Sequence, residues 1–122
     1  MPKSILIVED DAVLRAMLKD VLAPDGYTLS EAVDGDAALT ALASALPDLM
    51  LLDLWLPQRS GLDVLRQVKE RWPSLKVLVV SSTDSDRLVD QAIADGAAGF
   101  ISKPFQAMQV RMAVKLELEG KA

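Results

Sequence analysis

Short continuous runs of apolar residues alternate along this chain with longer stretches in which apolar positions repeat at helical spacing. Continuous runs are typical of strands buried on both faces of a sheet, and they predict strands at residues 5–8, 27–32, 49–52, 77–80 and 100–101. The amphipathic stretches predict helices at residues 13–22, 37–46, 62–72, 84–95 and 105–116. Because parallel neighbours in a sheet need a crossover helix, this order predicts an α/β fold with one doubly wound, five-stranded parallel sheet and five helices.

The length of the chain fits one domain with one core. With 122 residues, we expect a single domain over residues 1–122. The composition is 51% hydrophobic but only 4% aromatic, so Leu, Val, Ile and Ala should form most of the core. Met108 and Met112 in the last predicted helix are expected to fill the core as well, because flexible apolar side chains commonly do so.

Charge and hydropathy exclude several classes of partner. The net charge is −5 and there is no basic tract, which argues against direct binding of nucleic acid by this chain. No stretch approaches the roughly twenty apolar residues of a membrane helix, and the apolar run after Lys3 is too short for a signal peptide. We therefore expect a cytoplasmic protein without a membrane partner.

The chain contains neither cysteine nor histidine. Disulfides, thiolate catalysis and thiolate metal ligands are therefore excluded. The commonest transition-metal ligand and the usual acid or base at neutral pH are missing as well. Any metal site must use oxygen ligands, which favours hard cations such as Mg²⁺.

Polar side chains follow four of the predicted strands at their carboxyl ends. These are Glu9, Asp10 and Asp11 after the first strand, Asp53 after the third, Ser81 and Ser82 after the fourth, and Lys103 after the fifth. Ligands of doubly wound sheets bind at these ends, near the point where the winding reverses. The second strand contributes no comparable group, as expected if it lies at an edge of the sheet. We therefore expect one polar site at this end of the sheet.

This set of acids, hydroxyls and one amine suits phosphoryl transfer. A carboxylate among carboxylates is a poor nucleophile for a phosphoryl group, because both are anionic. Mg²⁺ held by Asp10 and Asp53 would neutralise the repulsion and bind phosphoryl oxygens. Lys103 can supply a second positive charge and Ser81 a hydroxyl donor. Taken alone, however, the first acidic cluster also fits a solvated helix start. Lys103 also fits a surface amine, and Ser81 also fits a loop hydroxyl whose hydrogen bonds are satisfied locally.

Four segments together resemble the receiver domains of bacterial two-component response regulators. They are Ile5–Asp11, Leu52–Pro57 with Gly61 following, Val79–Ser82 and Gly99–Phe105. Each segment alone is weakly specific, but in this order and at these strand ends they are highly specific. The resemblance extends over essentially the whole chain, and it implies a flavodoxin-like fold with the strand order 2-1-3-4-5.

The resemblance also implies the roles of the acidic residues. Asp53 would accept a phosphoryl group from a histidine kinase or a phosphotransfer protein. Glu9, Asp10, Asp53 and the backbone carbonyl of Trp55 would bind Mg²⁺, with Glu9 acting chiefly through water. Asp11 is expected to begin the first helix, where a carboxylate binds free amides and suits the helix dipole.

Lys103 and Ser81 are the residues expected to bind the phosphoryl group. In this family the peptide bond corresponding to Lys103–Pro104 is usually cis, a geometry that is rare elsewhere. Ser81 would be the switch hydroxyl, drawn toward the phosphoryl group when the acceptor is modified. Ser82 and Thr83 remain rival candidates, and Ser81 is favoured because it directly ends the apolar run.

Three positions depart from the commoner pattern of the family. Phe100 stands where the family keeps a switch aromatic, often Tyr, and lacks the hydroxyl. Trp55 is large for a position at the border of the pocket, so it is expected to shield the phosphoryl group or slow attack by water. Ser82 is larger and more polar than the usual small residue. By residue type alone, both aromatic side chains would be assigned to packing first.

The resemblance implies a phosphoacceptor switch and not a turnover enzyme. Phosphorylation would change the surface of the fourth helix, fifth strand and fifth helix, and so control an output domain, a partner protein or dimerisation. A phosphate-independent interaction module is the alternative. A phosphatase of the haloacid dehalogenase type would need an acid where Trp55 stands, and a flavodoxin-like electron carrier would need hydroxyls and glycines after the first strand.

Overall fold

The computed structural model describes residues 2–82 and 85–119. Its strands are β1 (Ser4–Val8), β2 (Thr28–Ala32), β3 (Leu49–Leu52), β4 (Lys76–Ser81) and β5 (Gly99–Ser102). Its helices are α1 (Ala12–Leu22), α2 (Gly35–Ser44), α3 (Gly61–Arg71), α4 (Asp86–Ala94) and α5 (Ala107–Glu119), with a short 3-10 helix η1 (Ala23–Asp25). Within these residues, no helix has the length and hydrophobicity needed to cross a membrane.

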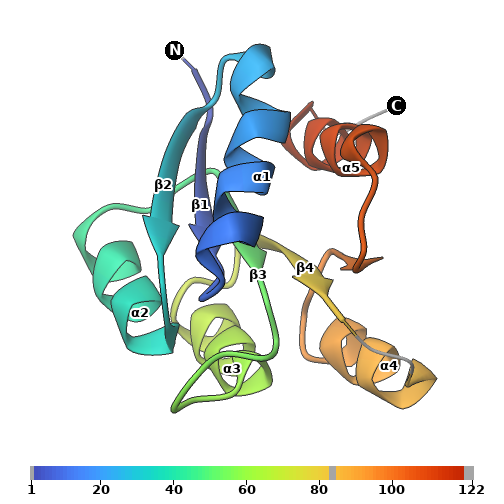
Figure 1. The fold of residues 1–122 in the computed structure, drawn as a ribbon. Coiled ribbons are helices and arrows are strands. Elements are labelled where there is room, and N and C mark those ends of the chain that lie inside the picture. Colours follow the sequence, from blue (N-terminus) through green and yellow to red (C-terminus); the bar gives the residue numbers. More distant parts are fainter. Residues whose placement is uncertain (1, 83–84, 120–122) are drawn as a thin grey trace.

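One parallel sheet with the strand order β2-β1-β3-β4-β5 forms the centre of the fold. Helices α1 and α5 cover one face of the sheet, and α2, α3 and α4 cover the other (Figure 1). The predicted doubly wound fold and the implied strand order are confirmed, with β2 at an edge. Because all the strands run in the same direction, their carboxyl ends lie at one end of the sheet.

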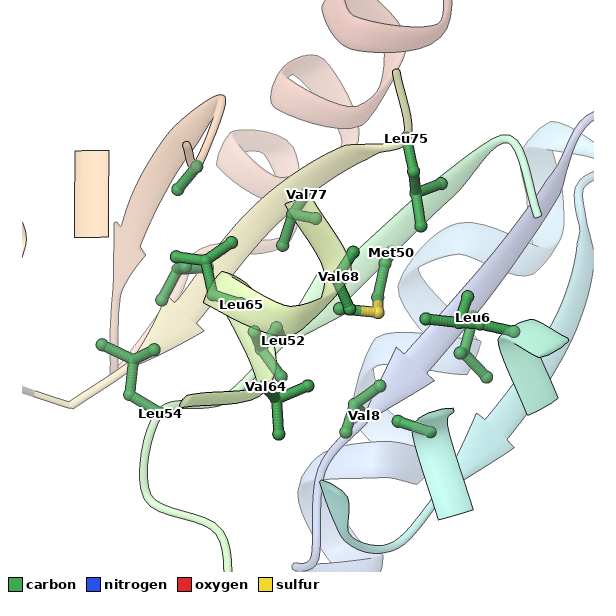
Figure 2. Packing of buried hydrophobic residues seen from close by; sticks show 14 of the residues in the cluster. Leu6, Val8, Met50, Leu52, Leu54, Val64, Leu65, Val68, Leu75 and Val77 are labelled. Atoms are coloured by element: carbon green, nitrogen blue, oxygen red, sulfur yellow. The ribbon is translucent and has the colours of Figure 1, made fainter. Parts of the chain in front are cut away.

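Alternate residues of the inner strands supply two cores, one on each face of the sheet. Figure 2 shows the larger core, where strand residues face helix α3. Its labelled members are Leu6, Val8, Met50, Leu52, Leu54, Val64, Leu65, Val68, Leu75 and Val77. On the other face, Ile5, Ile7, Leu49, Leu51, Leu78 and Val80 pack against Leu18, Leu22, Val110 and Val114 of α1 and α5. Burial on both faces explains why these strands appear in the sequence as continuous apolar runs.

The two methionines of α5 do not fill the core, so that prediction was wrong. Met108 is 59% exposed and Met112 is 63% exposed, whereas Val110 and Val114 are fully buried. Positions 110 and 114 share one face of the helix, and positions 108 and 112 fall on the opposite face. The helix therefore packs through its β-branched residues and leaves the methionines on the solvent side.

The boundaries of the helices differ from the prediction by a few residues, and capping explains the starts. Helix α2 begins two residues earlier than expected, because the side chain of Asp34 accepts the backbone N–H of Ala37 at 2.7 Å. It also ends two residues earlier, at Ser44. Asp84, the expected start of the fourth helix, lies outside the described residues, and α4 begins after a cap at Ser85.

Candidate functional site

The carboxyl ends of β1 and β3 bring three carboxylates together. Glu9 and Asp10 follow β1, Asp53 follows β3, and each side chain offers one oxygen within 4.8 Å of the other two. The strands are neighbours, and the backbone N–H of Asp53 donates to the carbonyl of Val8 at 3.1 Å. Glu9 and Asp53 are buried, while Asp10 is exposed. The pairing of two strands that are far apart in the sequence thus brings the acidic cluster together.

Three hydrogen-bond donors contact the carboxylate of Asp53. Its Oδ1 accepts the backbone N–H of Trp55 at 3.0 Å and the hydroxyl of Ser81 at 2.7 Å, and its Oδ2 lies 3.1 Å from Lys103 Nζ. Burial by itself would raise the pKa of Asp53, but these donors together lower it below its usual value. Asp53 is therefore ionised at neutral pH, and its hydrogen bonds fix the orientation of its carboxylate.

Lys103 contacts two of the three acids. Its Nζ lies 2.5 Å from Glu9 Oε1 and 3.1 Å from Asp53 Oδ2, and only 10% of its side chain is exposed. Its backbone N–H donates to the carbonyl of Ser81 at 3.0 Å, and its peptide bond to Pro104 is cis. Burial would lower the pKa of Lys103, but the hydrogen bonds to the two carboxylates raise it. The amine is thus a partly buried cation paired with two carboxylates and not a freely solvated surface group.

Glu9 differs from Asp53 in its electrostatic setting. Burial raises the pKa of Glu9 above its usual value and the charge of Asp53 adds to this effect, although Lys103 and the Asp11 amide oppose it.

Three clustered carboxylates with a single lysine leave an excess of negative charge. Their ligand atoms are all carboxylate oxygens, the type that binds Mg²⁺ and other hard cations, so the residues present fit a magnesium ion.

Ser81 is fully buried and is bonded on both sides. Its hydroxyl donates to Asp53 Oδ1 at 2.7 Å and accepts the backbone N–H of Leu54 at 3.2 Å. Of its two rivals for the switch role, Ser82 is exposed and Thr83 lies outside the described residues. Among the described hydroxyls, Ser81 is therefore the one in contact with the candidate acceptor. The amides of Leu54 and Trp55 were not predicted as site donors, because backbone groups carry no sequence signal.

Two residues shape the segment between β1 and α1. Asp11 lies at the N-cap of α1, where its Oδ1 accepts the backbone N–H groups of Val13 at 2.9 Å and Leu14 at 3.2 Å. Arg15 reaches back from the first turns of α1 to the carbonyls of Glu9 and Asp10. The sequence pattern predicts the cap at Asp11 but assigns no role to Arg15. A basic residue early in a helix that follows an acidic loop was the only available signal.

The two unusual aromatic residues occupy different settings. Trp55 is 60% exposed, and its indole N–H donates to the backbone carbonyl of Ser82. This bond links the loop after β3 to the loop after β4. Phe100 of β5 is half-buried and packs against the core on the side of α2, α3 and α4. Trp55 thus borders the site, whereas Phe100 lies at the edge of the core.

Known proteins share the sequence pattern of this chain. A family model described as the response regulator receiver domain matches residues 5–115. The chemotaxis protein CheY of Thermotoga maritima is 36% identical over 111 residues, which cover 90% of this chain and 92% of that protein. Response regulator MprA of Mycolicibacterium vanbaalenii is 37% identical over 105 residues, which cover 86% of this chain but 46% of MprA.

Solved structures share the fold as well. The receiver domain of NtrX from Brucella abortus has a TM-score of 0.90 at 33% identity, with 94% of this chain and 98% of that chain covered. In a longer NtrX structure, the match covers 98% of this chain, with a TM-score of 0.92 at 33% identity, and 27% of NtrX. The chain therefore spans nearly all of some relatives and half or less of others. From the family match, the shared fold and the acidic cluster, we conclude that this chain belongs to the family of response regulator receiver domains.

Proposed function

We propose that this chain is a phosphorylation switch in which Asp53 accepts a phosphoryl group from a histidine kinase or a phosphotransfer protein. One observation carries the proposal: a buried, ionised carboxylate contacts the hydroxyl of Ser81 and the amine of Lys103. Membership of the receiver family supports it, because these domains act as phosphoacceptors and not as turnover enzymes. We expect residues 1–122 to act as one receiver domain and the phosphoryl transfer to take place in the cytoplasm.

The transfer step requires a nucleophile that is anionic and correctly placed. An oxygen of Asp53 forms a bond to phosphorus as the bond from phosphorus to the donor's leaving atom breaks, and the leaving atom keeps the electron pair. The lowered pKa of Asp53 keeps this oxygen free of a proton at neutral pH. Lys103 and Ser81, at 3.1 and 2.7 Å from the carboxylate, would donate to the phosphoryl oxygens.

We assign the cation site to Glu9, Asp10 and Asp53, with the backbone carbonyl of Trp55 as a further ligand. Mg²⁺ bound there would offset the negative charge of acceptor and phosphoryl group. Exposed Asp10 is open to an arriving cation, whereas buried Glu9 already contacts Lys103. The negative charge of these carboxylates would repel an arriving phosphoryl group, so phosphoryl transfer to Asp53 would depend on a bound cation.

Ser81 and Lys103 would connect the acceptor to the output surface. Ser81 ends β4 before the loop to α4, and Lys103 follows β5 before α5. On phosphorylation, the Ser81 hydroxyl would break its hydrogen bond to the carboxylate and form one to a phosphoryl oxygen. This new bond would shift the equilibrium between two conformations of the surface formed by α4, β5 and α5, and Phe100 would take part in the change. An output domain, a separate partner or a second copy of this chain would read that surface.

Trp55 and Ser82 would set how long the phosphoryl group survives. The indole N–H of Trp55 donates to the carbonyl of Ser82, so the two residues join the loop after β3, which begins with Asp53, to the loop after β4. A large ring at this border restricts the approach of water and of bulky donors. We expect these residues to alter the lifetime of the phosphoryl group more than the identity of the acceptor.

Phosphorylation by a small donor tests this function. The wild-type protein is incubated with acetyl phosphate and Mg²⁺, and intact mass spectrometry counts the phosphates added. We expect one phosphate on the wild type, none on Asp53→Asn and none when a chelator removes Mg²⁺. Asp20→Asn, which makes the same change at an exposed aspartate of α1, should be labelled like the wild type.

Each other outcome has a clear meaning. An unlabelled wild-type protein would reject the switch and favour the phosphate-independent interaction module. A labelled Asp53→Asn variant would reject Asp53 as the acceptor. Continuous release of inorganic phosphate from many phosphate esters would show a phosphatase.

A further inference from the structure

Arg15 of α1 is a charged residue without a role in the proposed switch, yet its contacts lead to the segment that carries two of the proposed ligands. Its Nη1 donates to the carbonyl of Glu9 at 2.9 Å and to the carbonyl of Asp10 at 3.2 Å. Its Nε donates to Glu31 Oε1 of β2 at 2.9 Å. Only 16% of the side chain is exposed, so the guanidinium is enclosed by these partners.

The geometry of the helix explains this reach. Side chains on an α-helix lean toward its N-terminus, so a long residue near the start of α1 points back over the loop from β1. The carbonyls of Glu9 and Asp10 lie beyond Val8, the last residue of β1. A planar guanidinium can donate to both carbonyls and to a carboxylate at once, which a lysine amine on a single stem does less well.

We propose that Arg15 is a positioning residue that fixes the backbone of Glu9 and Asp10, and thereby keeps their carboxylates close enough to Asp53 for all three to bind one divalent cation. The carboxylate oxygens lie within 4.8 Å of one another, and this spacing depends on where the loop from β1 to α1 is held. Arg15 holds the loop through its two backbone carbonyls and ties it to β2 through Glu31. The inference rests on the proposed function only in assigning the cation to these acids.

A simpler role for Arg15 would be that of an ordinary surface ion pair with Glu31. Such pairs contribute little to stability. Lys19 provides a matched comparison, because its Nζ bonds the other carboxylate oxygen of Glu31 at 2.8 Å. Among the described residues, Lys19 makes no side-chain hydrogen bond to the carbonyls of Glu9 and Asp10. A change at Lys19 therefore removes the same charge from the same carboxylate and leaves the loop contacts in place.

Hydrogen exchange tests the positioning role without metal or phosphate. The reporters are the amide of Asp11, which donates to Glu9 Oε2 at 3.2 Å, and the amide of Glu9, which donates to the carbonyl of Ala32 at 3.1 Å. In Arg15→Met, we expect both amides to exchange about tenfold faster, because the hydrogen bonds of a charged donor to the loop are lost. In Lys19→Met, their exchange should match the wild type, and amides in β3 and β4 report that the fold is intact.

Titration with Mg²⁺ tests the consequence for the cation. By calorimetry, Arg15→Met should bind Mg²⁺ about tenfold more weakly, as is usual when a residue that orients metal ligands is removed. Labelling with acetyl phosphate should then need more Mg²⁺ for half-maximal rate, while the rate at saturating Mg²⁺ stays near that of the wild type. Lys19→Met should show neither shift. Arg15→Lys keeps the charge but loses the planar fork, so it should fall between Arg15→Met and the wild type.

Specific results would overturn the inference. Loop exchange in Arg15→Met equal to that in Lys19→Met would reduce Arg15 to a surface ion pair, whatever the metal data show. Tighter Mg²⁺ binding in Arg15→Met would show that the charge of Arg15 repels the cation more than its bonds help. If Arg15→Met does not fold, Arg15→Lys decides the same question. A wild-type protein that acetyl phosphate leaves unlabelled would reject the proposed function, and the exchange data would still decide the role of Arg15.

Discussion

Lys103 shows how much one side chain can control in this site. Its amine lies 2.5 Å from Glu9 and 3.1 Å from Asp53, so it draws on carboxylate oxygens that a divalent cation would also use. Two positive charges that share ligands over such distances repel each other even at the effective dielectric constant of a protein. In the proposed function, the same amine would also bind phosphoryl oxygens. Lys103 would therefore weaken cation binding and assist phosphoryl transfer.

Replacing Lys103 by methionine should separate these two effects. In Lys103→Met, we expect Mg²⁺ to bind about tenfold more tightly or better, because the repulsion is removed. Labelling by acetyl phosphate should become slower, since the phosphoryl oxygens lose a charged donor. Calorimetry measures the affinity, and mass spectrometry measures the rate. Lys3→Met, the same change at an exposed residue, should leave both unchanged, and weaker Mg²⁺ binding in Lys103→Met would show that the lysine organises the acids.

At the level of elements, α3 begins directly against the segment that carries the proposed acceptor. Gly61, its first residue, is buried, and its N–H donates to the carbonyl of Leu54 at 2.8 Å. A Cβ added at Gly61 would approach Leu54 Cα and the carbonyl oxygen of Asp53 to under 3.0 Å. Both atoms belong to the backbone, so no side chain can turn aside. The close approach of α3 to the site thus requires glycine at this position.

The Gly61→Ala variant should therefore lose stability and disturb the site. We expect the free energy of unfolding to fall by about 3 kcal/mol, the upper part of the range for overpacked positions, and labelling by acetyl phosphate to slow. Urea unfolding followed by circular dichroism measures the first effect. Gly99→Ala is the matched control, because its Cβ would meet only the end of the Leu78 side chain, at 3.0 Å, which can move. Equal losses in the two variants would contradict the argument.

Across the whole molecule, Ser81 joins the proposed acceptor to the region that would carry the output. Its hydroxyl bonds to Asp53 and to the amide of Leu54, and the loop that follows it leads to α4. Coupling between distant sites in switches of this kind amounts to about 1–3 kcal/mol. One buried hydrogen bond contributes about 1 kcal/mol net. The free energy of the hydrogen bond made by the Ser81 hydroxyl is thus large enough to account for much of the coupling free energy.

In Ser81→Ala, we expect Asp53 to accept phosphate while the response of α4, β5 and α5 is largely abolished. Hydrogen exchange over residues 86–119, before and after phosphorylation, measures that response. Ser82→Ala removes the exposed neighbouring hydroxyl and leaves its backbone carbonyl, the acceptor for Trp55, in place, so its response should match that of the wild type. A full response in Ser81→Ala, or its loss in Ser82→Ala, would transfer the switch role to the neighbouring residue.

The elements of the fold could be predicted because burial on both faces of a sheet leaves a direct mark on the sequence. All four residues of β3 are buried, and the continuous run Leu49–Leu52 marked that strand. Helix α5 shows the limit of this reasoning. Its apolar residues occur on several sides, so the sequence did not reveal that Val110 and Val114 would face the core and the methionines would face solvent.

The sequence by itself determined the elements, their order and the acidic, hydroxyl and amine groups that follow four of the strands. These follow from hydrophobic periodicity and from chain position, which are local properties. Only the tertiary structure decided that Lys103 contacts both Glu9 and Asp53, that backbone amides hold Asp53, and that Arg15 braces the loop. These contacts depend on the angle and distance between elements far apart in the chain, and on backbone groups that every residue shares. Local patterns carry no record of either.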